Sequence, residues 1–83
     1  MQQRPEINYP TRWTYVVVGE GEEELMAHIG RTVGDAEHVK NTSRTSAGGR
    51  YVSIEVTVLV TDEEQRLVLF RALGAHPAVR VVI

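Results

Sequence analysis

The order of hydrophobic and polar positions along the chain predicts both strands and helices. Aromatic and β-branched residues dominate positions 11–19, and their alternation predicts a strand that ends at Gly19. Residues 51–60 alternate more regularly and predict a strand with one face in the core. The residues expected to face the core are Val52, Ile54, Val56, Val58 and Val60. Those expected to face away are Tyr51, Ser53, Glu55, Thr57 and Leu59.

Two other stretches follow the longer period of a helix. The first of them is expected to end at Gly34, a typical place for a glycine just beyond a helix. Its buried stripe is predicted to be Leu25, Ile29 and Val33, with Met26. Asp62 is the predicted N-cap of the second helix, Gln65 is its capping-box partner, and Gly74 is expected to follow its last residue. The buried stripe of this helix is predicted to be Leu67, Phe70 and Leu73, with Val68 or Leu69.

Two further strands complete the predicted architecture. The polar residues 38–46 predict an edge strand, which a glycine-containing turn at 47–49 joins to the strand at 51–60. The stretch GAHP, residues 74–77, separates the second helix from a final apolar strand at 78–83, because proline cannot continue a helix. The resulting order, β-α-β-β-α-β, predicts an α+β ferredoxin-like plait. Its four-stranded antiparallel sheet has the strand order 4-1-3-2, with both helices on one face.

Composition and charge narrow the classes of function. The chain has 83 residues, which suits one small domain, here expected at 11–83 after an extended lead-in at 1–10. It has no cysteine, which excludes disulfides and thiol catalysis. The net charge of −2 argues against general electrostatic binding to nucleic acid or to an anionic membrane. We find no signal-like segment and no apolar run of about 20 residues, so we expect a cytoplasmic protein.

The titratable residues form no recognisable catalytic or metal-binding pattern. His28, His38 and His76 lack the spacing of metal ligands, and each is expected at the surface. Most carboxylates lie in the first turns of the two predicted helices, where they suit the positive end of the helix dipole. No nucleophile is expected next to a base, so we predict that the protein is not an enzyme and uses no cofactor.

A glycine-containing loop gives a weak signal for anion binding. Gly19, Glu20 and Gly21 follow a predicted strand and precede a predicted helix, as phosphate-binding loops do. However, Glu24 stands where the third glycine of a dinucleotide-binding loop would be, and the neighbouring glutamates would repel a pyrophosphate. A tight turn is therefore the simpler interpretation of this loop.

A group of basic residues suggests an alternative function. Lys40, Arg44 and Arg50 lie on the predicted hairpin, where they could bind nucleic acid or another anion. The RNA recognition motif shares the predicted fold, but it needs several aromatic residues on the open face of the third strand. Only Tyr51 meets this requirement, and Glu55 lies in the middle of that face. A solvated hairpin is the simpler interpretation.

Apolar residues are also expected on the open face of the sheet and along one of its edges. Those expected on the open face, as a partner or ligand surface, are Val16, Val18, Leu59 and Val82. The final strand is an edge strand whose run contains only one charged residue, Arg80. Unpaired backbone groups on such a strand predict a homodimer or another partner contact through Val79, Val81 and Ile83.

Three stretches of the chain resemble the YbeD-like family of small bacterial proteins. They are NYPTRWTYVVVG, SAGGRYVSIEVTV and GAHPAVRVVI, which occur in this order from residue 8 to the end. The matching positions are Tyr9, Pro10, Gly19, Ser46, Gly49, Tyr51, His76, Pro77, Val79 and Val81. Ala75 departs from the family pattern, because it separates Gly74 from His76.

The resemblance implies a fold similar to the ACT-type regulatory domains and no catalytic residues. It also carries the label of a regulator, sometimes called lipoate-binding. ACT-like domains bind small effectors near the first strand–helix loop, which corresponds here to residues 19–21. We therefore expect a non-enzymatic regulatory or interaction module that binds a small effector or a protein partner. Binding of nucleic acid or an anion through the basic hairpin is the alternative, and an enzyme subunit whose chemistry lies on a partner is a third hypothesis.

Overall fold

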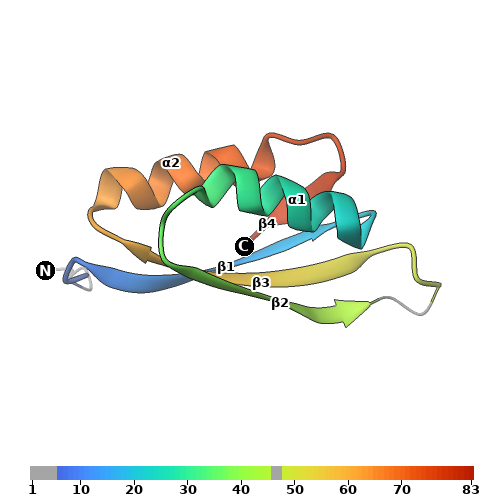
Figure 1. Cartoon of the computed structure of the whole chain (residues 1–83), viewed down its shortest axis with the longest axis horizontal. Helices are drawn as coiled ribbons and strands as arrows, with labels where there is room; N and C mark the ends of the chain where they lie inside the picture. Colours follow the sequence, from blue (N-terminus) through green and yellow to red (C-terminus); the bar gives the residue numbers. More distant parts are fainter. Residues whose placement is uncertain (1–5, 46–47) are drawn as a thin grey trace, which may run out of the picture.

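The four strands form one antiparallel sheet, with both helices packed on the same face (Figure 1). The computed structural model describes residues 6–45 and 48–83. The strands are β1 (Thr11–Gly19), β2 (His38–Thr45), β3 (Val52–Val60) and β4 (Val79–Val82), and the helices are α1 (Glu22–Val33) and α2 (Glu63–Gly74). The strand order is β2-β3-β1-β4, which confirms the predicted ferredoxin-like plait. Residues 46 and 47, which include part of the predicted turn, and residues 1–5 of the predicted lead-in lie outside the described residues.

The two central strands pair along their whole length. β1 and β3 are in register from Thr11 opposite Val60 to Gly19 opposite Val52. Every second residue of β3 is buried, as the alternation predicted. The pairing of β4 with β1 is much shorter, because it covers only the half of β1 from Val16 to Gly19.

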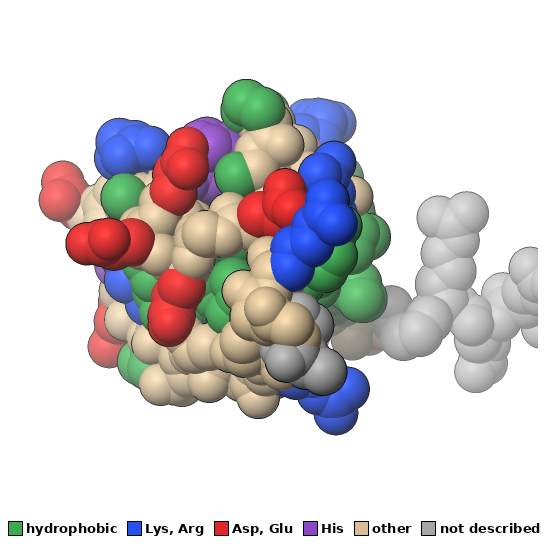
Figure 2. All heavy atoms as spheres, turned by 90° about the vertical axis from the view of Figure 1, so that its right-hand side faces the viewer, with side chains coloured by type: hydrophobic (Ala, Val, Ile, Leu, Met, Phe, Trp, Pro, Cys, Tyr) green, Lys and Arg blue, Asp and Glu red, His purple; other side chains and the backbone are tan. Residues whose placement is uncertain are grey.

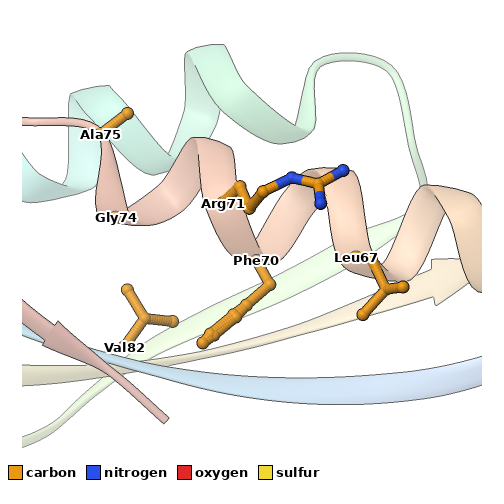
Figure 3. Close-up of a pocket in the computed structure, with 6 residues that line it drawn as sticks. All are labelled: Leu67, Phe70, Arg71, Gly74, Ala75 and Val82. Atoms are coloured by element: carbon orange, nitrogen blue, oxygen red, sulfur yellow. The ribbon is translucent and has the colours of Figure 1, made fainter.

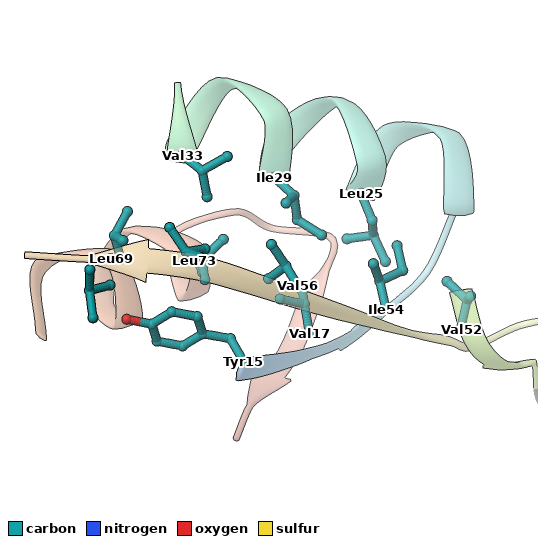
Figure 4. Close-up of a cluster of buried hydrophobic side chains, with 12 residues drawn as sticks. Tyr15, Val17, Leu25, Ile29, Val33, Val52, Ile54, Val56, Leu69 and Leu73 are labelled. Carbon is teal, nitrogen blue, oxygen red and sulfur yellow. The ribbon is translucent and has the colours of Figure 1, made fainter. Parts of the chain in front are cut away.

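The core lies between the helices and the covered face of the sheet. Figure 4 shows side chains of α1 pointing down onto those of β1 and β3. The buried hydrophobic residues are Tyr15, Val17, Leu25, Ile29, Val33, Val52, Ile54, Val56, Val58, Val60, Leu69 and Leu73. Burial of each of the larger aliphatic side chains stabilises the fold by about 1.5–3 kcal/mol. On α1, the predicted burial of Leu25, Ile29 and Val33 is confirmed.

The predicted buried face of α2 is correct only in part. Leu73 is buried as predicted, and so is Leu69, one of the two alternatives, whereas Leu67, Val68 and Phe70 are 42%, 46% and 40% exposed. The helix is oriented by contacts that the apolar pattern does not reveal.

Arg66 connects α2 to the start of β1. The Tyr15 hydroxyl donates a hydrogen bond to the Arg66 carbonyl at 2.6 Å, and burial raises the pKa of Tyr15, which keeps this donor protonated. The Arg66 guanidinium lies 4.5 Å from the centre of the Trp13 ring and donates to the Tyr9 hydroxyl at 2.9 Å. With Arg66 held over β1, Leu69 and Leu73 face the core, and Leu67 and Phe70 lie at its exposed margin.

The ends of α2 follow the predicted capping with two changes. Asp62 accepts a hydrogen bond from the Gln65 N–H at 2.8 Å, as expected for an N-cap. The Gln65 side chain accepts from the Thr61 N–H at 2.7 Å, so the reciprocal bond reaches one residue further back than in a capping box. Gly74 is the last helical residue rather than the one after it, and Ala75 is the C-cap.

Two glycines, one at the end of β1 and one in α1, allow other parts of the chain to approach closely. A Cβ at Gly19 would overlap the Ala78 carbonyl oxygen, so only glycine lets β1 pass this close to the segment before β4. At Gly30, a Cβ would come within 3.0 Å of the Lys40 Nζ, so α1 packs tightly here against the side chain of an edge-strand lysine.

The buried face of β3 gives a direct test of the register. Val56 is completely buried and Thr57 is half-buried on the opposite face. We expect Val56→Asp to lower the free energy of unfolding by about 3–5 kcal/mol, because it buries a charge without a partner. That loss is comparable to the whole stability of a small domain, about 5–10 kcal/mol. Thr57→Asp should cost about 1 kcal/mol or less, and equal denaturation curves for the two variants would refute the register.

Candidate functional site

The outer edge of β4 presents backbone groups to solvent. The Val16 N–H donates to the Ile83 carbonyl at 3.0 Å, and the Ile83 N–H donates to the Val16 carbonyl at 2.9 Å. In an antiparallel pair, such residues alternate with residues whose N–H and C=O groups point the other way. Val82 therefore directs these groups outward, where no residue in the described ranges pairs with them. The expected edge at the final strand is present.

The side chains of β4 divide between the two faces of the sheet. Val82 packs against the hydrophobic core on the helix side, so the expectation that it faces the open side is wrong. The reason is the register, which places Val82 opposite the buried Val17. Val81, 46% exposed, lies opposite Val18 on the open face, and Ile83 is 75% exposed. Val79 packs partly against the core.

Glu20, in the loop of residues 19–21, forms ion pairs with two arginines, Arg50 just before β3 and Arg80 in β4. We call these three residues the Glu20 clamp. The Glu20 carboxylate accepts from the Arg50 Nε at 2.8 Å and pairs with an Arg80 terminal nitrogen at 3.1 Å. The hydrogen bond from Arg50, followed by the charge of Arg80, lowers the pKa of Glu20. Figure 2 shows this end of the molecule, where an acidic side chain lies against basic ones. Gly21 has a φ of 83°, which glycine adopts readily, and it is the N-cap of α1.

The three basic residues of the predicted hairpin lie in three different places. Lys40 is half-buried on the helix side, where its Nζ donates to the Met26 carbonyl of α1 at 3.2 Å. Arg44 lies on the open face, in a shallow hollow of about 250 Å³ shared with Ser53 and Glu55. Arg50 is held by Glu20. The structure therefore does not bring these cations together on one surface, and binding of nucleic acid through them stays a prediction.

The prediction that His28 lies at the surface is wrong. His28 is 8% exposed, and its Nε2 lies 3.0 Å from the Leu73 carbonyl, to which it donates. Its ring centre is 4.7 Å from that of His76, whose Nδ1 accepts from the Ala78 N–H at 3.0 Å. The His76 Nε2 is 3.5 Å from a Glu24 carboxylate oxygen. His28 follows the buried Leu25 by three residues, so the two lie on the same side of the helix. This spacing could have predicted that His28 lies at the margin of the buried stripe.

These histidines serve the fold. His28 caps a carbonyl in the last turn of α2, a group that has no partner within its own helix. His76 fixes the turn before β4 through its bond to Ala78. His38 is half-buried, with its Nδ1 2.7 Å from the Ala36 carbonyl. No group of three or more histidine, aspartate or glutamate residues that could hold a metal ion occurs in the part of the chain that the structure describes.

An apolar groove, which the sequence pattern does not indicate, lies along the outer flank of α2. Figure 3 shows Leu67 and Phe70 extending from α2 toward the sheet, with Val82 of β4 beside them. The groove has a volume of about 420 Å³, and Arg71, Gly74 and Ala75 complete its lining. It was missed because Leu67 and Phe70 were assigned to the core.

Comparisons with known proteins give the chain relatives of similar length. A family model described as "Protein of unknown function (DUF493)" matches residues 4–83. A UPF0250 protein of Ralstonia nicotianae is 35% identical over 81 residues, covering 93% of this chain and 84% of that one. A Campylobacter jejuni protein described as uncharacterized is 33% identical over 75 residues, covering 90% of this chain and 86% of its own.

Solved structures share the fold at lower sequence identity. The solution structure of protein HP0495 from H. pylori superposes with a TM-score of 0.84 at 20% identity, covering 98% of this chain and 89% of that one. The ACT domain from the GTP pyrophosphokinase of Chlorobium tepidum superposes with a TM-score of 0.64 at 15% identity, covering 87% of this chain and 94% of that one. The expected ACT-like relationship is therefore confirmed at the level of the fold. Among the described residues, no helix is long and apolar enough to cross a membrane.

The Glu20 clamp predicts a specific dependence of stability on pH. Because the folded-state pKa of Glu20 lies below its ordinary value of 4.5, the clamp stabilises the fold above that pH. This stabilisation is lost as the pH falls through the folded-state pKa. We expect Glu20→Gln to unfold at a lower temperature than the parent at pH 7, with the difference shrinking as the pH falls below 4.5 and through the folded-state pKa of Glu20.

Glu23→Gln is the matched control for this measurement. Glu23 lies in the first turn of α1, and its carboxylate pairs with no residue of 6–45 or 48–83. Thermal unfolding followed by circular dichroism at pH 7 and at an acidic pH compares the two variants. If Glu20→Gln retained its full deficit at the acidic pH, the assignment of the stabilisation to the ionised clamp would be wrong.

Proposed function

We propose that this chain, which belongs to the DUF493 family of small bacterial proteins of unknown function, is a non-catalytic regulatory module that acts by association. The association that its geometry supports best is with a second copy of the chain along the outer edge of β4. One observation carries this proposal: Val82 directs its backbone groups outward there, unpaired within the described ranges, beside the exposed side chains of Val81 and Ile83.

The charge on β4 does not prevent such pairing. Arg80 is the one charged residue of this strand, and a charge on an edge strand usually discourages the approach of another strand. Here the Arg80 guanidinium is already paired with Glu20. Two β4 strands related by a two-fold axis would therefore bring together two guanidiniums that each have a carboxylate partner, rather than two unpaired cations.

The apolar surface beside the edge gives the contact a driving force. Val81 and Ile83 are exposed on the open face, and the half-buried Val16 and Val18 of β1 lie next to them. Pairing of two edges would continue these apolar residues from one sheet into the next. Removal of their surface from water favours association by roughly 25 cal/mol for each Å² buried.

The regulatory part of the proposal rests on the fold and on the chemistry of the titratable groups. A domain of this fold belongs to a GTP pyrophosphokinase in Chlorobium tepidum, and this analogy favours action on another protein over catalysis. The titratable cluster of Glu24, His28 and His76 is engaged with backbone groups and with itself. We place this role in the cytoplasm. A small effector at residues 19–21, lipoate included, stays a prediction from the resemblance.

Sedimentation equilibrium tests the homodimer. We expect the parent protein to show a reversible monomer–dimer equilibrium, and we expect Val81→Glu to weaken it about tenfold or more, because two added carboxylates would face each other across the axis. The control is Val39→Glu, since Val39 is 56% exposed on the open face of β2, at the opposite edge of the sheet. A parent protein that stays monomeric at high micromolar concentration would overturn the proposal.

A further inference from the structure

The side of β1 that faces β4 is only partly covered. β1 extends from Thr11 to Gly19, but β4 and Ile83 pair with its residues Val16 to Gly19 alone. The first half of β1 pairs with β3 on one side. On the other side, no residue of the described ranges forms a ladder with it. We call this uncovered stretch, together with the α2 flank above it, the β1 gap.

The backbone groups in the β1 gap can be assigned from the register. Val16 exchanges two hydrogen bonds with Ile83, so its N–H and C=O point toward the β4 side. The alternation of an antiparallel strand then directs the same groups of Thr14 and Arg12 to that side. Both residues lie in the regular part of the pairing with β3, where no bulge disturbs the alternation. Thr14 and Arg12 therefore offer two donors and two acceptors in line with β4.

α2 lies on the helix side of this stretch of β1, where its Arg66 contacts Trp13 and Tyr15. α2 extends past the end of β4 in Figure 1, and Figure 3 shows Phe70 and Leu67 pointing toward the sheet beyond Val82. Leu67 and Phe70 are 42% and 40% exposed, which is costly for large apolar side chains that have room for a partner beside them. The gap thus combines an unpaired backbone with an apolar wall, as sites that bind an added strand do.

The charge of the gap indicates the chemistry of its occupant. Arg71 is the one charged side chain that lines the groove, and no carboxylate of the described residues forms an ion pair with it. A segment with an acidic residue would supply the missing partner. The edge strands of a second copy would not, because β2 contains Lys40 and Arg44, β4 contains Arg80, and neither strand contains an aspartate or glutamate.

We propose that the β1 gap binds an extended segment of a partner protein, which adds a short strand to β1 in line with β4. Apolar side chains of this segment contact Leu67 and Phe70, and an acidic side chain pairs with Arg71. This site is distinct from the outer edge of β4, and it does not depend on the formation of a homodimer. Binding would lengthen the edge of the sheet by one short strand.

Two blocked peptides test the proposal by amide NMR. Both have seven residues of alternating valine and threonine, with one valine replaced by glutamate in the first and by lysine in the second. We expect the glutamate peptide to shift the amide signals of Arg12 and Thr14 and to slow their hydrogen exchange. We expect the lysine peptide to bind up to about fivefold more weakly, the scale of an exposed ion pair.

Variants on α2 identify the apolar wall. Leu67→Ser should weaken binding of the glutamate peptide about tenfold, because it removes buried apolar surface. Val68→Ser is the matched control, since Val68 is 46% exposed on the same helix and does not line the groove. Thr14→Pro removes a backbone N–H that β3 does not use, so it should abolish peptide binding. Because it also removes the hydroxyl that bonds to Thr57 at 2.8 Å, Thr14→Val, which keeps the N–H, is its control.

Three results would overturn the proposal. The first is the absence of any shift at Arg12 and Thr14 at millimolar concentrations of the glutamate peptide. The second is an equal loss of affinity in Leu67→Ser and Val68→Ser. The third is a change in sedimentation caused by Leu67→Ser without any peptide, which would assign the gap to a second copy of the chain. The homodimer along β4 is judged separately, by the effect of Val81→Glu.

Discussion

The pairing of β1 with β3 is the interaction on which the rest of this structure depends. These two strands are in register over the full length of β1, so the period of two divides their side chains between two faces without a slip. One face receives both helices and becomes the core, and the other stays open. A slip by one residue would exchange the valines of β3 with its glutamate and threonine. The positions of both edge strands follow from this central pair.

The strands could be predicted from the sequence because their burial is one-sided. In β3, each buried valine or isoleucine alternates with a more exposed residue, so the pattern and the structure coincide. In α2, leucine, valine and phenylalanine occupy four consecutive positions from Leu67 to Phe70, which cover all sides of a helix. Because this run places apolar residues on all sides, the helical period does not predict which side of α2 is buried. The orientation was instead set by Arg66 with Trp13 and Tyr15, which are distant in sequence.

The candidate site was predictable only in part, for a related reason. An apolar final strand with one charge indicates an edge, and β4 is one. However, which of its side chains face the helices depends on the bulge between Val18 and Gly19, and no residue pattern marks that bulge. The pairing of Arg80 with Glu20 joins residues 60 positions apart. The β1 gap requires a comparison of the lengths of β1, β4 and α2 in space.

The two edges of this sheet are protected to different extents. β2 has a polar sequence, two basic residues and a bulge between Thr42 and Arg44, all of which discourage a further strand. The opposite edge has Arg80 bound to Glu20, exposed valine and isoleucine on one face and exposed leucine and phenylalanine on the other. Since both the outer edge of β4 and the β1 gap lie on this side, a strand bound in the gap would extend the line of β4. The longer edge would then offer a second copy more backbone groups to pair with, so that partner binding and self-association would favour each other.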